Sequence, residues 1–507
     1  MRGALLARSV VATLVASCVM PLQVQAAARP VQAASLSALP ATVRVNVTPN
    51  GINYTLVTST GNVTATSYDG RTLYYGPRRL VLRTNVRRAE GITITLPPRP
   101  ESLTSDERVA RRQALREARN AELEARGEPA KIVTVPFEIS LLRTDDDALG
   151  TPLISDQKAV PVTFTTTDGI LTVNGRGFRG TLDVTTDDGG DPIVVNTVET
   201  GVYLASVVGS EEPSTWEPEA LAAQAIAART YLATHLRRHD HYDLEGDTRD
   251  QEYDGVGNEV RSTLRAIERT AGIVATYRGA AIEALYSANA GGVTEDSENI
   301  FGSALPYLRS VTSPGDELAK DSSWGRTSWE WSREFTAPQL GDYMRFRGFD
   351  VGVPIRIEVL SQTAAGRPTR VRVVGNKATK DISKDAMRYY FGLKSNLFTP
   401  ILRPSNDLEW VSERDTDRLR DMDVLGASKV RANYEHTFDT DGHRIGIHAY
   451  EWLFSIPARF DFVGRGFGHS VGMSQWGAQG MALKGSNYEQ ILKHFYQGIE
   501  LTHVGGA

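Results

Sequence analysis

An Ala- and Leu-rich segment from Glu219 to Arg238 places the firmest limit on the fold of this chain of 507 residues. Apolar residues recur in it at helical spacing, among them Leu221, Ala225, Ala228 and Leu232. Pro218 suits the first turn of a helix, where its missing N–H costs no hydrogen bond, and Ser214 is a candidate N-cap. The segment therefore predicts a long helix that organises the elements around it.

The residues before this helix have the composition of β-strands. Val, Thr, Ile and Tyr partly alternate with polar residues from Val43 to about Pro97 and from Lys131 to about Tyr203, and Asp69-Gly70 is typical of a hairpin turn. A charged stretch at residues 104–127 predicts a solvated helical insertion. Helix and strand signals then alternate up to an amphipathic helix at Tyr488–Tyr496. We expect an α+β fold, with a mixed α/β domain preceded by a β-rich region.

Charge and hydropathy exclude two classes of protein. A net charge of -5 and a pI of about 6.1 argue against a nucleic-acid partner, because neutralising many phosphates requires clustered Lys and Arg. After the first thirty residues, no apolar run approaches the roughly 20 residues that a membrane-spanning helix needs. We expect a globular protein with more than one domain.

The N-terminus has the pattern of an export signal. Two arginines precede an apolar stretch from Val10 to Leu22, and small residues follow at Ala26–Ala28. We assign residues 1–26 to a signal peptide and expect the protein in the cell envelope, in the periplasm or the cell wall. Cys18, the only cysteine, leaves two alternatives: a lipoprotein signal with a lipidated Cys18, or an ordinary signal cleaved near Ala26 or Ala28. The apolar run continues past Cys18, which favours the second alternative, and a chain cleaved there has no thiol for a disulfide or a thiolate metal site.

Four ordered blocks of sequence are similar to those of a known family. Residues 207–231 read V-V-G-S-E-E-P-S-T-W-E-P-E-A-L-A-A-Q-A-I-A-A-R-T-Y, and residues 286–311 contain Y-S-A-N-A-G-G and P-Y-L. Residues 388–395 read R-Y-Y-F-G-L-K-S, and residues 466–478 read G-F-G-H-S-V-G-M-S-Q-W-G-A. In this order they resemble the sporulation protein D (SpoIID)/LytB amidase-enhancer family. The resemblance implies a SpoIID-like domain at residues 172–507 and leaves the β-rich region at residues 27–171 uncovered.

The resemblance implies that Glu211 is the catalytic residue of a cell-wall lytic transglycosylase. Cleaving a glycosidic bond requires a carboxylic acid to protonate the leaving oxygen, and usually a second carboxylate. A lytic transglycosylase needs only one, because the 6-hydroxyl of the muramic acid unit attacks its own anomeric carbon and leaves a 1,6-anhydro sugar. Such an acid needs a raised pKa. Glu212 stands where the family commonly has Met; since a residue before Pro avoids the helical conformation, we expect both carboxylates in an extended segment, with only one facing the cleft.

Arg229 is the first candidate for a supporting role, because it lies in the middle of the predicted Ala-rich helix. A charge buried there needs a partner, so Arg229 orients Glu211, holds a substrate oxygen or forms a structural ion pair.

Other residues of the four blocks are candidate substrate contacts. Gln224, Tyr231, Ser287 and Asn289 have side chains that suit hydrogen bonding to a sugar, with simple packing as the alternative. The Gly-rich run around His469 suits a loop that borders a cleft, with Gln475 beside it and the Trp476 ring available to stack on a sugar. A purely structural turn is the alternative there.

We expect no metal and no cofactor. Some family members carry zinc ligands in a segment like Y-D-L-C-D-T-T-H-C-Q-V-Y. Residues 242–253 of this chain read Y-D-L-E-G-D-T-R-D-Q-E-Y, which keeps the frame but has neither the thiols nor that His. His235, His239 and His241 lie nearby, but the adjacent arginines favour a solvated helix end over a metal site.

Two functions follow from the resemblance, and a third is weaker. The enzyme would cleave between N-acetylmuramic acid and N-acetylglucosamine in peptidoglycan glycan strands, including strands without stem peptides. LytB-type relatives are described as amidase enhancers, so the alternative is a binding protein with a cell-wall amidase as partner. The third possibility is a structural wall anchor that binds through its N-terminal β region.

Overall fold

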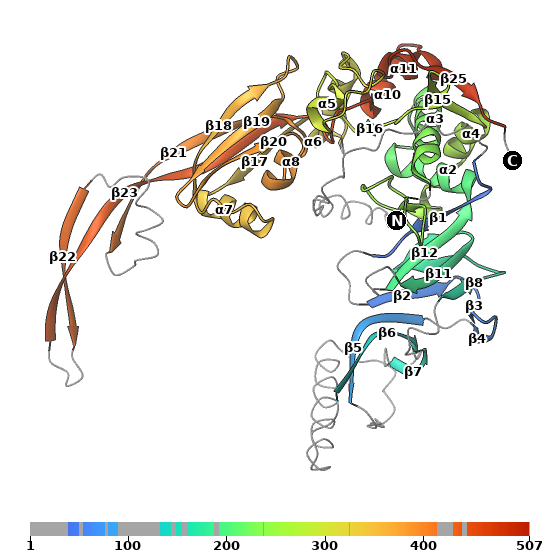
Figure 1. Cartoon of the computed structure of the whole chain (residues 1–507), viewed down its shortest axis with the longest axis horizontal. Helices are drawn as coiled ribbons and strands as arrows, with labels where there is room; N and C mark the ends of the chain where they lie inside the picture. The colour runs from blue at the N-terminus through green and yellow to red at the C-terminus, as the bar shows by residue number, and fades with distance from the viewer. Residues whose placement is uncertain are drawn as a thin grey trace, which may run out of the picture. The chain divides into compact units, whose positions relative to one another are not determined.

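A computed structural model describes residues 39–49, 54–76, 80–89, 132–142, 149–154, 161–186, 192–236, 238–323, 325–412, 429–438 and 444–505. The expected signal peptide with Cys18 and the charged stretch at 104–127 lie outside these residues. The chain forms two compact units, each built from separate segments (Figure 1). We call residues 38–214 with 235–271 the N-terminal unit, and residues 215–234 with 272–504 the C-terminal unit.

The N-terminal unit is rich in β-strands, as the sequence predicts. One sheet has the order β13-β1-β12-β11-β8-β3-β4 and a second has the order β10-β9-β2-β5-β6-β7. The strands are β1 (Thr42–Asn46), β2 (Tyr54–Ser59), β3 (Val63–Ser67), β4 (Thr72–Gly76), β5 (Leu80–Ala89), β6 (Ile132–Leu142), β7 (Leu149–Ile154), β8 (Val162–Thr165), β9 (Leu171–Val173), β10 (Arg176–Phe178), β11 (Thr181–Thr186), β12 (Pro192–Glu199) and β13 (Leu244–Glu245). Alternate residues of β1, such as Val43 and Val45, are fully buried, as expected for a sheet with one face on the core.

The predicted hairpin turn at Asp69-Gly70 is confirmed. It joins β3 to β4, which pair antiparallel, and Gly70 has a φ of 82°, a left-handed value that favours glycine.

The second β-rich stretch of the sequence, predicted from Lys131 to about Tyr203, ends earlier than expected. β12 stops at Glu199, and α2 (Thr200–Glu211) follows at once. Its sequence, T-G-V-Y-L-A-S-V-V-G-S-E, contains two glycines and three valines, which have low helix propensity. Packing decides the outcome: the helix buries Tyr203, Leu204 and Val207, and it contacts the 3₁₀ helix η2 (Gly255–Asn258) and α4 (Arg261–Arg269).

The predicted Ala-rich helix is confirmed as α3 (Pro218–His235), with one correction at its start. Ser214 does not cap it, because the first intrahelical bond runs from the Leu221 N–H to the Glu217 carbonyl, 3.1 Å. Pro218 explains this start, since the residue before a proline avoids the helical conformation. The small side chains from Ala220 to Ala228 are buried on all sides, as in a helix at the centre of a domain.

The first hydrophobic core of the C-terminal unit surrounds α3. This core joins α3 to β14 (Ile273–Tyr277), α10 (Gln475–Leu483) and α11 (Tyr488–Phe495). β14 pairs with β15 (Ala280–Ala281) and β25 (Glu500–His503). The expected amphipathic helix near the C-terminus is thus confirmed as α11, and the Asn487 side chain caps it by accepting the Gln490 N–H at 2.9 Å.

The rest of the C-terminal unit contains a second core and two further sheets. One sheet has the order β17-β23-β21, with β22 paired to β23, and the other has the order β18-β19-β20. The elements are α5 (Ser297–Ile300), η3 (Pro314–Asp321), α6 (Arg326–Trp329), β17 (Glu330–Phe335), α7 (Ala337–Phe346), β18 (Pro354–Gln362), β19 (Pro368–Gly375), β20 (Thr379–Ser383), α8 (Ala386–Phe391), β21 (Leu397–Ser412), β22 (Lys429–Phe438) and β23 (Arg444–Arg465). Figure 1 shows β21 and β23 as a long ribbon that extends past α7 and α8.

Helices and strands are thus both abundant, which confirms the α+β class. In the part of the chain that the structure describes, no helix is long and apolar enough to cross a membrane.

Candidate functional site

The candidate catalytic residue, Glu211, is the last residue of α2. Glu212 follows it with φ −132° and ψ 148°, and its backbone N–H still bonds the Val208 carbonyl at 3.0 Å. The expectation that both carboxylates lie in an extended segment is therefore wrong for Glu211. Pro213 restricts only the residue directly before it, so Glu212 is extended while Glu211 completes the helix.

The end of α2 is fastened to the loop that follows β13. One carboxyl oxygen of Glu211, Oε1, accepts the backbone N–H of Glu252 at 3.0 Å. The hydroxyl of Ser210 accepts the Asp254 N–H at 3.1 Å and the Asn258 amide at 2.9 Å. These bonds fix the position of the half-buried Glu211 carboxyl.

Two more carboxyl groups lie near Glu211. Glu212 is only 2% exposed, and neither of its carboxyl oxygens has a hydrogen-bond partner among the described residues. Burial, and then the charge of Glu211, raise the pKa of Glu212 well above its ordinary value. The same two causes raise the pKa of Glu252 to about 7. Glu212 and Glu252 therefore both keep a proton to higher pH than an ordinary glutamate does.

The segment where some family members bind zinc holds ion pairs in this chain. Glu245, Arg249 and Asp250 occupy the positions of the thiols and the His. Arg249 pairs with Glu245 at 2.9 Å and with Asp247 at 2.9 Å. Asp250 accepts the Glu245 N–H at 2.8 Å, and Tyr242 donates its hydroxyl to Glu245 at 2.7 Å. A guanidinium at the centre of these acids does not fit a zinc ion, since it already supplies the positive charge.

Two of the histidines near the end of α3 have different surroundings. His235 is buried at the last position of the helix, and the His239 ring stacks on Tyr242 with centroids 4.4 Å apart. Among the residues that the structure describes, no cluster of three or more His, Cys, Asp or Glu is arranged to hold a metal.

The other three sequence blocks meet in the C-terminal unit. β16 (Tyr286–Ser287) pairs in parallel with β24 (Met473–Ser474), and isolated bridges join Asn289 to Phe467 and Ser395 to Gly468. Gly468 has a φ of 103°, and a Cβ placed on it would lie 2.7 Å from the Cβ of Ser287. This close approach explains the glycine of the fourth block. Blocks that are far apart in sequence therefore build one loop cluster.

Asn289 shapes this loop cluster from a fully buried position. Its amide donates to the carbonyl of Asp316 at 2.9 Å, and its oxygen accepts the Gly291 N–H at 2.8 Å. The structure therefore uses both ends of the amide internally. Ser287 is also buried, but its hydroxyl has no partner among the described residues.

Asp316, which sequence reasoning missed, is the buried acid of the loop cluster. It is 0% exposed and accepts the N–H groups of Ala290 at 3.1 Å and Gly292 at 3.0 Å, together with the Ser474 hydroxyl. Burial raises its pKa to about 6, although these donors act in the opposite direction. Its sequence context, P-G-D-E, is typical of an exposed turn and gives no sign of burial.

His469 bonds to backbone within the loop cluster. Its Nδ1 accepts the Val471 N–H at 3.0 Å, and the ring also has a backbone hydrogen bond with Tyr286. Burial, and then the positive charge of Arg388, lower its pKa to about 4, so the ring is neutral at pH 7. Ser470, next to it, has a φ of 63°, a left-handed value that favours glycine. These bonds favour the structural alternative for this turn.

Arg229 lies inside the C-terminal unit on α3. It donates to the Ile273 carbonyl at 3.2 Å, and burial lowers its pKa to about 10, so it remains charged at pH 7. Glu211 belongs to the N-terminal unit, so a contact between Arg229 and Glu211 stays a prediction.

The remaining candidate substrate contacts are buried. Trp476 is 6% exposed and meets Trp216 edge-on, with centroids 4.8 Å apart, which leaves little ring surface for stacking on a sugar. Gln224, Tyr231 and Gln475 are buried as well, and both amide atoms of Gln224 have no hydrogen-bond partner among the described residues.

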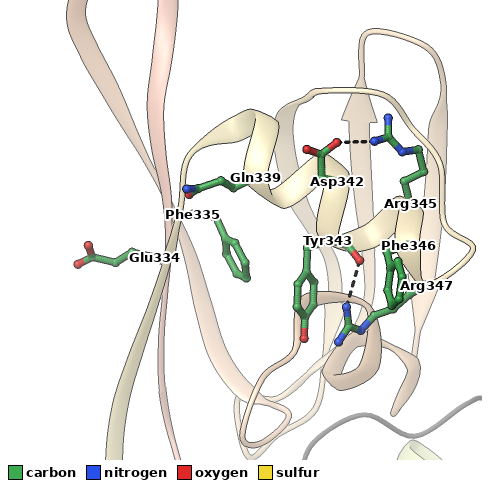
Figure 2. Close-up of a pocket in the computed structure, with 8 residues that line it drawn as sticks. All are labelled: Glu334, Phe335, Gln339, Asp342, Tyr343, Arg345, Phe346 and Arg347. Carbon is green, nitrogen blue, oxygen red and sulfur yellow. Dashed lines mark hydrogen bonds and ion pairs between the residues drawn. The ribbon is translucent and has the colours of Figure 1, made fainter. Parts of the chain in front are cut away.

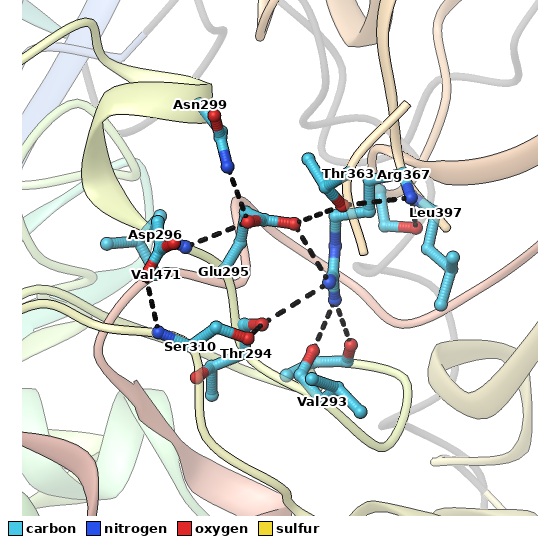
Figure 3. A network of polar contacts seen from close by, with 12 residues as sticks. Val293, Thr294, Glu295, Asp296, Asn299, Ser310, Thr363, Arg367, Leu397 and Val471 are labelled. Atoms are coloured by element: carbon cyan, nitrogen blue, oxygen red, sulfur yellow. Dashed lines mark hydrogen bonds and ion pairs between the residues drawn. The ribbon is translucent and has the colours of Figure 1, made fainter. Parts of the chain in front are cut away.

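A second feature that sequence reasoning missed supports the loop that carries Asn289. Arg367, between β18 and β19, is fully buried and donates to the carbonyls of Ala290 and Val293 (Figure 3). It pairs with Glu295 at 3.5 Å, and Glu295 accepts the Thr363 hydroxyl at 2.8 Å. No local sequence pattern predicts this clamp, because its partners are more than 70 residues away.

A cavity of about 760 Å³ lies elsewhere in the C-terminal unit, between β17 and α7 (Figure 2). In this cavity the guanidinium carbon of Arg347 lies 3.5 Å from the centroid of the Tyr343 ring. It is lined by Glu334, Phe335, Gln339, Asp342, Tyr343, Arg345, Phe346 and Arg347. None of the candidate residues belongs to this lining, so the cavity is not the predicted site.

Comparisons with known proteins agree with the motifs. Residues 188–277 match the SpoIID family model, described as stage II sporulation protein. An uncharacterized protein of Brachyspira hyodysenteriae is 27% identical, over 67% of this chain and 76% of that protein. Stage II sporulation protein D of Bacillus subtilis is 25% identical, over 60% of this chain and 74% of its own length. The amidase enhancer of B. subtilis is 27% identical over 59% of this chain, but the match covers only 40% of that protein. The residues matched by the family model include both Glu211 and Glu252.

Proposed function

Because this chain belongs to the SpoIID/LytB family, we propose that it is an exported lytic transglycosylase of the cell envelope. It cleaves the β-1,4 bond between N-acetylmuramic acid and N-acetylglucosamine in glycan strands. The observation that carries this proposal is the placement of Glu211. Its carboxyl is held at the end of α2 by the Glu252 amide and stays half-exposed, beside two carboxyl groups that favour a bound proton.

The reaction needs one proton and no water. Glu211 gives its proton to the glycosidic oxygen as the bond to the anomeric carbon breaks. The 6-hydroxyl of the muramic acid unit forms the new bond to this carbon, and Glu211 takes the hydroxyl proton back. The products are a 1,6-anhydromuramic end and a free N-acetylglucosamine end, and the enzyme returns to its starting state.

Glu211→Gln is the first test. The amide keeps the shape of the side chain but transfers no proton, so turnover should fall by at least about 10²–10⁴-fold with little change in glycan affinity. Purified glycan strands, intact and peptide-free, would be incubated with each protein and analysed by mass spectrometry for anhydromuramic ends. Glu268→Gln, the same change on the exposed face of α4, is the matched control and should leave turnover unchanged. If wild-type protein yields no anhydromuramic ends from either substrate, this proposal is wrong.

A second candidate function comes from the name of one relative, an amidase enhancer. In that case the chain binds glycan and a cell-wall amidase without cleaving the strand. Glu211→Gln distinguishes the two: it abolishes anhydromuramic products if the chain is an enzyme, but it leaves stimulation of an added amidase intact if the chain is an enhancer.

A further inference from the structure

Glu252 lies against the proposed catalytic carboxyl in two ways. Its backbone N–H donates to Oε1 of Glu211 at 3.0 Å, and burial, followed by the charge of Glu211, raises the pKa of its half-buried side chain to about 7. The zinc-binding segment quoted above for some family members has Val at this position. The chain therefore adds a carboxyl group beside a residue whose proton the reaction must move.

Charged groups around Glu252 are mostly acids. Asp254 and Asp247 add to the negative charge near it, and Arg176 acts in the opposite direction. Arg176 forms an ion pair with Asp254 at 3.4 Å. Negative charge thus predominates around the two glutamates, which favours retention of a proton.

Glu212, the residue that follows Glu211, supplies an independent observation. It is almost completely buried, and its two oxygens have no partner among the described residues. An ionised carboxylate in such a place is costly, so Glu212 holds a proton. Glu212 is therefore neutral and adds no charge to the pair formed by Glu211 and Glu252.

We propose that Glu252 is a positioning residue for Glu211: its amide fixes one carboxyl oxygen, and its carboxyl keeps a proton on the pair at neutral pH. This inference rests on the proposed transglycosylase activity. Before the reaction the two carboxyl groups share one proton. Glu211 delivers this proton to the leaving oxygen and recovers one from the 6-hydroxyl, so the pair ends with one proton and no other reactant is consumed. Two neighbouring carboxyl groups lose their protons in separate steps, because the charge left by the first opposes ionisation of the second. The pair therefore keeps its last proton to a higher pH than a single exposed Glu would.

The test is the pH profile of kcat/KM for Glu252→Gln on peptide-free glycan strands, measured with the full chain. Gln keeps the backbone amide and the side-chain volume but removes the negative charge. Glu211 should then lose its proton at lower pH, which moves the alkaline limb down by about one pH unit and lowers activity on that limb about tenfold. Glu252→Asp, which keeps the charge, should restore most of the wild-type profile, and the exposed Glu268→Gln should not move it.

Thermal unfolding of each variant separates a change of profile from a loss of fold. An unchanged alkaline limb in a folded, active Glu252→Gln protein would overturn the inference and leave the proposed function standing. The inference would also be overturned if Glu252→Asp moved the alkaline limb as far as Glu252→Gln does, because the loss of charge would then not be the cause. Absence of anhydromuramic products from wild type would instead refute the proposed function itself.

Discussion

Two buried acids, one in each unit, differ in the hydrogen-bond donors that surround their carboxyl groups. Asp316 is surrounded by two backbone N–H groups and the Ser474 hydroxyl, whereas the oxygens of Glu212 have no partner among the described residues. Both are almost completely buried. The donors partly offset burial and hold the pKa of Asp316 at about 6, so its ionised form predominates at pH 7, whereas both causes of the shift at Glu212 raise its pKa. The difference shows that donors, rather than depth, determine which buried acid holds its charge and organises a loop.

Asp316→Ala tests the supported acid and should have the largest effect on stability. It leaves the Gly292 N–H and the Ser474 hydroxyl without an acceptor, at about 1–3 kcal/mol each, while the Ala290 N–H keeps a bond of 3.3 Å to the Ser474 oxygen. We expect a loss of roughly 3–5 kcal/mol in the free energy of unfolding, measured by denaturant titration. Asp316→Asn keeps one acceptor oxygen and should lose less. A change below about 1 kcal/mol for Asp316→Ala would show that the loop does not depend on this acid.

Glu245 is an intermediate case, because its charge is paired with a cation. Arg249→Ala removes the guanidinium and leaves Glu245 with the Tyr242 hydroxyl and the Asn46 amide. Since Arg249 is partly exposed, we expect a moderate loss of about 1–2 kcal/mol, again by denaturant titration. Lys320→Ala breaks an ion pair exposed on both sides and is the control. Equal effects of the two variants would mean that burial of Glu245 adds nothing to the pair.

Glu212→Met should have the smallest effect, and the opposite sign. Replacing an unpartnered carboxyl by an apolar side chain of similar volume should stabilise the protein by roughly 1 kcal/mol at pH 7. Because the folded protein binds this proton more tightly than the unfolded chain, wild-type stability should fall as pH rises from the ordinary carboxyl pKa towards the raised value. The gain from Met should therefore grow over that range, which melting temperatures at pH 5, 7 and 9 would measure. A gain independent of pH would contradict a buried proton on Glu212.

Periodicity in the sequence was sufficient for the strongly patterned elements. It predicted α3, α11 and β1, because their apolar spacing follows the geometry of helix and strand. It failed for α2, whose valines and glycines are poor helix formers and whose helical state depends on packing.

The residues of the candidate site also divide into those that the sequence revealed and those that it did not. Glu211 could be found because a recognisable motif surrounds it, and the extended state of Glu212 followed from Pro213. Asp316 and Arg367 could not, since their partners lie 24 or more residues away and are brought together only by the fold. The burial of Trp476 was missed for the same reason, because an aromatic residue in a Gly-rich loop has no local sign of depth.

The arrangement of α3 has a consequence for the order of events during biosynthesis. Residues 215–234 are made early, yet they pack in the unit whose other segments are residues 272–504. Glu219, near the start of α3, accepts the N–H of Tyr488, 269 residues later. While the ribosome adds those residues, the apolar surface of α3 has no final partner, and it stays available to chaperones or to self-association. Closing such a long loop also makes folding slow, so the complete chain, rather than any growing part of it, is the species that acquires the native C-terminal unit.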